Sequence, residues 1–354
     1  MKTTVLLSPS RIYSIDTFRL VSIFFVILHH IEAFKNSYTI YYPNPIFKFL
    51  YYFPENVRFL PFFFIAAGYF FSKGATKGEP LEGRLLKYCK RLARLFFLWS
   101  LIYAFFMIPK ELALQGHNYF AQAFHAFYFN VSRAIQHPIA FLMQGTIENF
   151  WFFPALIIGL VLVVVLHKLG KEKYIIPLGA SLYLFALFGK AYSVLPFGYE
   201  VEFEMRNGPF ISTLFVGIGW LLAKKNNFQL KTAVLLIFAG IAMHILEAYF
   251  LFSRYDLKPR HDYLLGTILF CTGIFILTLA RPNIGKDTVF PQWGGQLTLG
   301  IYAVHTLFIK FFGIFRPHLS AVTYEIVQPV VIFLLSVFFT LLLKRNSFTK
   351  ILVT

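Results

Sequence analysis

Several ionisable residues interrupt one apolar stretch near the start of the chain: Asp16, Arg19, His29, His30 and Glu32. Ionisable side chains inside a membrane-spanning helix are costly, so they are functional candidates by default. Arg19 and His30 are eleven residues apart, which is close to three helical turns, so their side chains share one face about 16 Å apart along the axis. Asp16, one turn before Arg19, can hold its guanidinium in place.

The two neighbouring histidines differ in direction and are expected to differ in task. In a helix, His29 projects about 100° away from His30. Imidazole exchanges a proton near neutral pH, and the Glu32 that follows strengthens a functional interpretation of this pair. The alternative is that Asp16 and Arg19 mark one membrane interface and the histidines the other, and the spacing alone leaves both interpretations open.

The composition indicates which elements position these residues. The chain is 58% hydrophobic and only 14% charged, against about 25% charged in soluble domains. Ten apolar stretches are long enough to cross ~30 Å of hydrocarbon. We therefore predict an all-α, polytopic membrane bundle in a single domain over residues 1–354. The expected spans are 17–35, 57–72, 93–109, 150–167, 174–191, 209–223, 231–252, 262–280, 297–313 and 324–343.

The distribution of Lys and Arg predicts the orientation. With the N-terminus in the cytoplasm, 20 of the 33 Lys and Arg residues lie on the cytoplasmic side, and the loop at 73–94 contributes most. Both termini are thus expected inside, with the first span retained as an uncleaved anchor. The aromatic, His-containing segment at about 110–149 is expected on the outer membrane surface as interfacial helix.

Other partners are not favoured by the sequence. Topology and anionic lipids explain most of the net charge of +17, so no nucleic acid is expected, although an anionic cytosolic substrate is a second interpretation. No His/Cys cluster has metal-ligand spacing, so no metal is expected. Cys89 and Cys271 are not expected to form a disulfide. The sequence does not indicate an oligomeric state.

Six motifs follow one another in an order that resembles the acyltransferase-3 family of bacterial integral-membrane acyltransferases. The resemblance covers essentially the whole chain, with two departures, Ala67 before Gly68 and Asn149-Phe150 before Trp151, that bear on acceptor specificity. The motifs are Arg19-x10-His30, the segment 61–70, Arg91-Leu-Ala-Arg94, Phe150-Trp151-Phe-Phe-Pro-Ala-Leu, Arg206-Asn-Gly208 and Gly300-Ile-Tyr302-Ala-Val-His305.

The resemblance implies an enzyme of the bacterial cytoplasmic membrane that moves an acyl group from acyl-CoA, usually acetyl-CoA, to a hydroxyl of a carbohydrate, lipid-linked glycan or related acceptor. Acyl-CoA would be a substrate, and no permanently bound cofactor is expected. His30 would be the general base or, less readily, an acyl-carrying nucleophile. Arg19 would contact the donor or the developing oxyanion, oriented by Asp16, and Arg91 and Arg94 would hold the CoA phosphates.

A further set of polar and aromatic residues could meet the acceptor or be structural: Glu148, Trp151, Arg206, Glu247 and His305. For Glu247 we expect either an acceptor contact or a structural pair with His244 or an arginine. For Trp151, an interfacial position competes with carbohydrate stacking.

Two other function classes fit a ten-span chain. A transporter or flippase of an envelope precursor would line a permeation path with the same ionisable residues, although no inverted repeat is evident. A sensor or scaffold would usually have larger loops. Donor binding separates these classes, because only the enzyme should bind acyl-CoA and transfer or hydrolyse its acyl group.

Overall fold

The computed structural model describes residues 11–78, 80–107, 119–257 and 261–354, and every regular element in these ranges is a helix. Each of the ten predicted apolar segments coincides with a helix, so the all-α prediction is confirmed for this part of the chain. These helices are α1 (Tyr13–His30), α4 (Pro61–Thr76), α5 (Leu81–Phe106), α9 (Phe152–Lys168), α10 (Ile175–Phe188), α11 (Pro209–Leu222), α12 (Leu230–Tyr255), α13 (Leu265–Ala280), α15 (Thr298–Phe312) and α16 (Ala321–Arg345).

Four stretches in the described residues are long and apolar enough to cross a membrane: Glu148–Lys168, Leu230–Tyr255, Thr298–His318 and Ala321–Arg345. Shorter apolar helices, Pro209–Leu222 and Leu265–Ala280, pack among them. The protein is thus an integral membrane protein, whereas ten crossings and cytoplasmic termini stay predictions.

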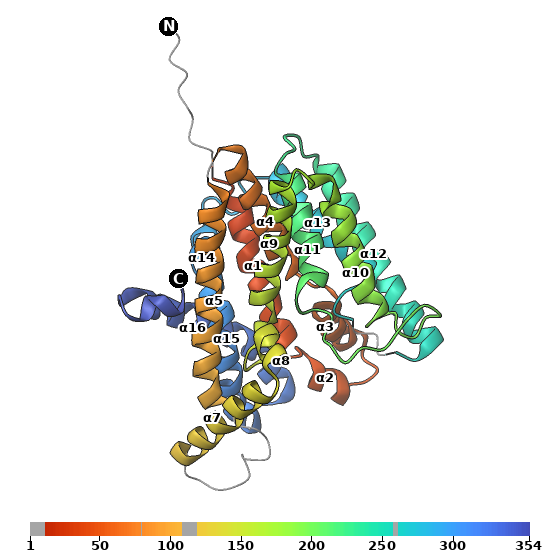
Figure 1. The fold of residues 1–354 in the computed structure, drawn as a ribbon. Helices are drawn as coiled ribbons and strands as arrows, with labels where there is room; N and C mark the ends of the chain where they lie inside the picture. The colour runs from red at the N-terminus through yellow and green to blue at the C-terminus, as the bar shows by residue number, and fades with distance from the viewer. Residues whose placement is uncertain (1–10, 79, 108–118, 258–260) are drawn as a thin grey trace.

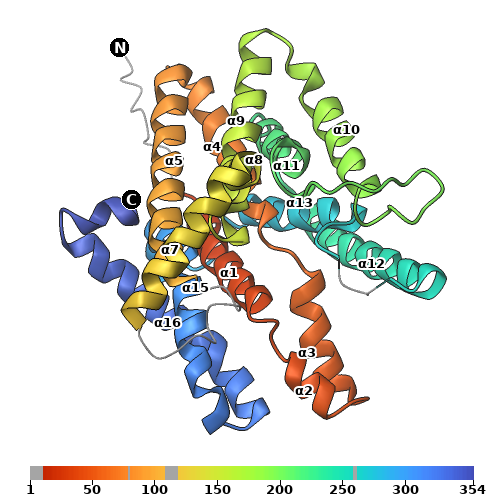
Figure 2. The same ribbon diagram turned by 60° about the horizontal axis from the view of Figure 1, so that its bottom comes forward.

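The described chain also contains short helices, most of which lie between the long ones. They are α2 (Lys35–Ile40), α3 (Pro45–Asn56), α8 (Pro138–Gln144), α14 (Phe290–Gln296), η1 (Glu148–Trp151), η2 (Glu172–Tyr174), η3 (Gly313–His318) and η4 (Thr349–Leu352). In Figure 2, α2 and α3 lie beyond the end of α1 at which His30 stands.

The expected first span, 17–35, was placed too far along the chain. Helix α1 ends at His30, and Glu32 and Phe34 have φ values of 48° and 64°. A helix cannot continue through residues in the left-handed region, so the chain turns away directly after the histidine pair. His30 therefore stands at the end of its helix.

The expected loop at 73–94 is also corrected by the structure. Helix α5 begins at Leu81, twelve residues before the predicted start of the third span. Glu82 stands in its first turn, where a carboxylate suits the helix dipole, and Lys168 at the end of α9 contacts it. Most of the basic residues expected in this loop therefore lie on a helix.

The segment 110–149 is helical as expected where the structure describes it, and residues 110–118 lie outside the described ranges. Helix α7 (Tyr119–Gln136) packs on α5, and Asn130 Nδ2 donates to the carbonyl oxygens of Ala104 and Met107, at 3.0 Å each. Its position on the membrane surface stays a prediction.

Helix α1 runs through the middle of the bundle (Figure 1) and packs against α3, α4, α13, α14, α15 and α16. Its contacts with α14 are close, because a Cβ on Gly294 would lie 1.7 Å from the carbonyl oxygen of Asp16. The bundle thus brings residues from both ends of the sequence to the two ends of α1.

Candidate active site

Near the N-terminus of α1, Arg19 lies beside a carboxylate and an aromatic ring. Its Nη1 is 3.1 Å from Asp16 Oδ1, so the expected contact is present. Arg11 Nη2 holds the other oxygen of Asp16 at 2.8 Å. The Arg19 guanidinium also lies over the ring of Phe70, 5.1 Å from its centroid. These contacts fix the direction of Arg19.

At the other end of α1, three imidazoles lie next to one another in what we call the histidine stack, where His30 is stacked on His305 and tilted against His29. The ring centroid of His30 lies 5.2 Å from that of His29 and 5.3 Å from that of His305 on α15. His305 is fully buried, and its Nδ1 donates to the carbonyl oxygen of Tyr302 at 2.7 Å. Within the described chain, neither ring nitrogen of His30 has a hydrogen-bond partner, so one is available to take a proton.

His29 has a buried carboxylate as its partner. Its Nδ1 lies 3.1 Å from Oε2 of Glu55, a residue of α3 with no exposed surface. A carboxylate in this position fixes the tautomer and orientation of an imidazole, as in hydrolase triads. The two histidines therefore differ in their partners, whereas a difference in task stays a prediction.

Two guanidinium groups and a carboxylate stand next to the histidines. Arg58 Nη2 donates to Asp262 Oδ1 at 2.7 Å. Arg206 Nη2 donates to Glu148 Oε2 at 3.0 Å, and its Nη1 lies 3.6 Å from Asp262 Oδ2. Arg206 is thus held between two carboxylates from separate segments.

A cavity of about 50 Å³ adjoins the histidine stack. His29 and His30 line it together with Trp151, Tyr302 and other side chains. Trp151 is 6% exposed, so the structure supports a position within the protein and not in an interfacial belt. Its indole lies edge-on to the ring of Tyr263, with 6.3 Å between centroids.

A second cavity, of about 160 Å³, adjoins Arg19 and the first cavity. Leu60 and Tyr302 line both spaces and therefore stand between them. Arg19, Tyr88 and Arg91 line the far side of the second cavity. The two neighbouring cavities thus lie along α1, one at Arg19 and the other at His30.

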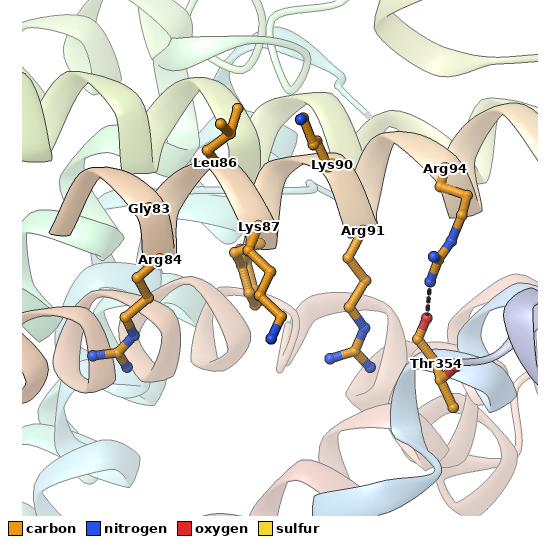
Figure 3. A pocket seen from close by; sticks show the side chains of 9 residues that line it. Gly83, Arg84, Leu86, Lys87, Lys90, Arg91, Arg94 and Thr354 are labelled. Atoms are coloured by element: carbon orange, nitrogen blue, oxygen red, sulfur yellow. Dashed lines mark hydrogen bonds between the residues drawn. The ribbon is translucent and has the colours of Figure 1, made fainter. Parts of the chain in front are cut away.

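A third, larger space of about 760 Å³ lies over the basic face of α5. Figure 3 shows Arg84, Lys87, Arg91 and Arg94 projecting to the same side of this helix, and Lys90, which also lines the space, projecting to the other side. Their spacing of three or four residues places them on one helical face.

The two arginines expected to bind the acyl-CoA donor, Arg91 and Arg94, differ in the cavities that they line. Arg91 and Tyr88 line both this basic space and the cavity at Arg19. Arg94 lines only the basic space, and its Nη2 donates to the carbonyl oxygen of Thr354 at 2.7 Å. Arg91 is therefore the better placed of the pair to follow a ligand inward.

A fourth cavity, of about 540 Å³, adjoins the histidine cavity from the opposite side. Arg206, Asp262 and Tyr263 line both. His261 lines the fourth cavity, and burial lowers the pKa of its imidazole although the neighbouring Asp262 opposes this. The cavities therefore form a series from the basic face of α5, past Arg19 and His30, to the loops around residue 206.

Glu247 stands apart from these four cavities. Its Oε1 accepts from the hydroxyl of Tyr192 at 2.6 Å and its Oε2 from the backbone N–H of Gly266 at 3.0 Å. The expected pair with His244 or an arginine is not the arrangement found. Glu247 instead accepts from the first turn of α13, where helix N–H groups lack partners, which is a structural role.

Sequence reasoning did not select Glu55, Arg58 and Asp262. Arg58 fell inside the predicted second span and Asp262 at the edge of the eighth, so the rule on ionisable residues in spans could have found both. Glu55 lay in a segment predicted to be a loop, and no local pattern connects it with His29. Asn149, noted as a departure, donates from Nδ2 to Thr306 Oγ1 at 3.0 Å, next to His305.

Comparison with known proteins identifies one family and two related proteins. The acyltransferase domain of the acyltransferase-3 family matches residues 12–344. A serine/alanine racemase of Enterococcus gallinarum is 27% identical over 306 residues, which are 81% of this chain and 40% of that protein. An amino-acid racemase of Enterococcus faecalis is 25% identical over 266 residues, 71% of this chain and 35% of that protein.

The chain thus spans less than half the length of these two curated relatives. No solved structure matches it. The family pattern, in contrast, covers nearly the whole chain and includes both ends of α1, the basic face of α5 and the three histidines. This chain belongs to the acyltransferase-3 family of acyltransferase-type enzymes.

Proposed function

We propose that the protein transfers an acyl group, most simply acetyl, from acyl-CoA to a hydroxyl of a cell-envelope carbohydrate or related acceptor in the bacterial cytoplasmic membrane. The supporting observation is the series of neighbouring cavities, which extends from a basic surface to the histidine stack. CoA carries phosphates at one end and the thioester at the end of a long arm. A donor of that shape needs cations at the opening and a narrow route to the reacting group.

The residues along the route suit the parts of this donor. Arg84, Lys87 and Arg91 on one face of α5 offer charge-assisted hydrogen bonds to phosphates. The cavity between Arg91 and Tyr302 would take the pantetheine arm. The thioester would then reach the space beside His30, where little water can enter and wasteful hydrolysis is slowed.

His30 would act as general base. It takes the proton of the acceptor hydroxyl as the oxygen attacks the thioester carbonyl; the C–O bond forms, the C–S bond breaks, and the CoA thiolate leaves. The proton on His30 passes to this thiolate, so that ester and CoA are the products. Arg19 would contact the donor and Asp16 would orient it. General bases of this kind contribute about 10²- to 10⁴-fold to rate.

The test is release of free CoA from acetyl-CoA by the purified protein in nanodiscs, with and without a cell-envelope glycan fraction. Release by the wild type that rises with the glycan fraction, and falls at least about 100-fold in His30→Ala, is expected. His125→Ala is the matched control, because His125 is exposed on α7. Near-normal turnover by folded His30→Ala would refute the assignment of the base.

A transporter or flippase is the second candidate. The cavities adjoin one another along the bundle, which is also what a permeation path requires. The names of the two relatives suggest a small amino acid as the cargo to test. Uptake of labelled serine into proteoliposomes, with no binding of acetyl-CoA, would favour this function over acyl transfer.

A further inference from the structure

The wall between the histidine cavity and the fourth cavity contains two guanidinium groups around one carboxylate. Asp262 accepts from Arg58 at 2.7 Å and lies 3.6 Å from Arg206. All three side chains line the histidine cavity, and Arg206 and Asp262 also line the fourth cavity. A molecule that passes from one space to the other must meet this cluster.

The charges in the wall are buried unequally. The side chain of Arg58 is 7% exposed and that of Arg206 is 21% exposed. Their carboxylate partners are more exposed, 38% for Asp262 and 70% for Glu148. In both ion pairs the guanidinium group is therefore the more buried partner and the carboxylate the more exposed one. Buried cations are stable only with a close anion.

Both arginines also keep a hydrogen-bond donor without a partner. The Nε of Arg58 and the Nε of Arg206 are buried and unpaired in the part of the chain that the structure describes. His261 Nε2, in the fourth cavity, is also buried without a hydrogen bond there. An unpaired buried donor is costly, so this wall is suited to a ligand that brings acceptor oxygens.

We propose that the acceptor substrate carries a carboxylate, which Arg58 and Arg206 bind in place of Asp262. This inference rests on the proposed acyl transfer. The planar guanidinium can bind a carboxylate through two parallel N–H···O bonds, whereas Asp262 makes one hydrogen bond, to Arg58, and lies 3.6 Å from Arg206. The fourth cavity, at about 540 Å³, is within the usual size of small-molecule sites. It would hold the remainder of a sugar acid or hydroxy acid.

The other charges of the fourth cavity do not oppose an anion. Glu204 is paired with Lys190 at 2.9 Å, and Asp256 is exposed at the end of α12. Among the charged residues of the fourth cavity, Arg206 and Asp262 are the ones that also line the histidine cavity. The acceptor hydroxyl would then lie beside His30, while the carboxylate stays on the arginines.

The test compares acceptors that differ in a carboxylate, with acetyl-CoA as donor and free CoA as the readout, in nanodiscs. The pairs are glucuronate against glucose and N-acetylmuramic acid against N-acetylglucosamine. We expect kcat/KM to be at least about 10-fold higher for the acid of each pair, as for the loss of a charge-assisted hydrogen bond. Equal or better use of the neutral partners, with CoA release intact, would overturn this inference and leave acyl transfer standing.

Two substitutions test whether the preference for an acidic acceptor depends on the two arginines beside the histidine cavity. Arg58→Gln and Arg206→Gln should each move the acid-to-neutral ratio of kcat/KM towards one, whereas Arg254→Gln, an exposed arginine on α12, should leave it unchanged. Asp262→Asn removes the competing carboxylate and should lower KM for the acid. An unchanged ratio in both folded arginine variants would overturn the assignment.

Two further outcomes are informative. Glucose 6-phosphate used as well as glucuronate would overturn the choice of a carboxylate. No CoA release with any acceptor, from wild-type protein that is monodisperse, would overturn the proposed acyl transfer and this inference with it.

Discussion

The imidazole rings of His30 and His305 stack at 5.3 Å between centroids with 26° between their planes. They come from the first and the last but one of the long helices, α1 and α15. The contact places a fully buried ring against the candidate base. Because Nδ1 of His305 is bonded to the carbonyl oxygen of Tyr302, that ring cannot turn freely and fixes the direction of His30.

His305→Ala should therefore lower kcat for CoA release and leave KM for acetyl-CoA unchanged. An aromatic contact contributes about 0.5–1.5 kcal/mol, which corresponds to about 2- to 12-fold. His305→Phe keeps a flat ring in the stack and should retain more activity than His305→Ala. If the Phe variant is as impaired as the Ala variant, the nitrogens of His305 take part in the chemistry and the positioning role is wrong.

Glu55→Gln should reduce activity although Glu55 meets no reacting atom. The substitution replaces the charged partner of His29 Nδ1 by a neutral amide. Hydrogen bonds to charged groups contribute about 1.5–3 kcal/mol, so CoA release should fall about 10- to 100-fold if His29 assists the transfer. Steady-state kcat measures this, and Glu202→Gln, at an exposed position, is the control. Unchanged kcat in the Gln variant would contradict a functional His29–Glu55 pair.

The sequence predicted the ten long helices because each is recorded locally, as an apolar run of sufficient length. It also predicted the shared face of Arg19 and His30, since helical periodicity alone decides that. The end of α1 was predicted five residues late, because Glu32 and Phe34 adopt positive φ values that neither residue type signals. Local chemistry does not specify such a turn.

The partners of the site residues could not be predicted in the same way. Glu55 and Asp262 reach His29 and Arg206 from segments far away in sequence, and only the packing of the helices brings them together. Hydropathy also placed the start of the third span after most of the basic residues of α5, because Arg and Lys reduce the apolar signal. Helix α5 nevertheless continues through them, since charged residues beyond the membrane are good helix formers.

Arg91→Gln should raise KM for acetyl-CoA more than Arg94→Gln does. Arg91 lines both the basic space and the inner cavity, whereas Arg94 is engaged with the carbonyl oxygen of Thr354. Loss of one charge-assisted bond to a phosphate predicts a rise of about 10- to 100-fold for Arg91→Gln. Lys225→Gln removes an exposed charge that lines neither of these spaces and serves as the control. A larger effect at Arg94 would reverse the order proposed for the donor route.

Glu325→Ala should destabilise the turn that follows His30. This buried carboxylate on α16 accepts from the backbone N–H groups of Asn36 and Ser37 at 2.8 and 2.9 Å, and from both side chains. Without it, several buried donors lose their acceptor, each at a cost of about 1–3 kcal/mol. The thermal unfolding midpoint in detergent should fall by several degrees, less for Glu325→Gln, and not for Glu202→Gln. An unchanged midpoint in the Ala variant would show that α2 finds other partners.

Gly219→Ala should prevent the correct packing of α4 on α11. A Cβ at Gly219 would lie 1.9 Å from the carbonyl oxygen of Ile65, and one at Gly68 would lie 2.0 Å from that of Val216. The two glycines thus let the backbones approach reciprocally, as small residues do between membrane helices. Because the obstruction is backbone, neither helix can give way without moving the wall that carries Ala67.

The measurement is the yield of monodisperse protein on size exclusion from detergent. Gly219→Ala should reduce it several-fold, whereas Gly313→Ala should not, because nothing lies within 4 Å of a Cβ built at Gly313. Gly68→Ala should behave as Gly219→Ala does, since both clashes arise in the same contact. Normal yields and normal CoA release from the two α4–α11 variants would mean that these helices are further apart than the structure has them.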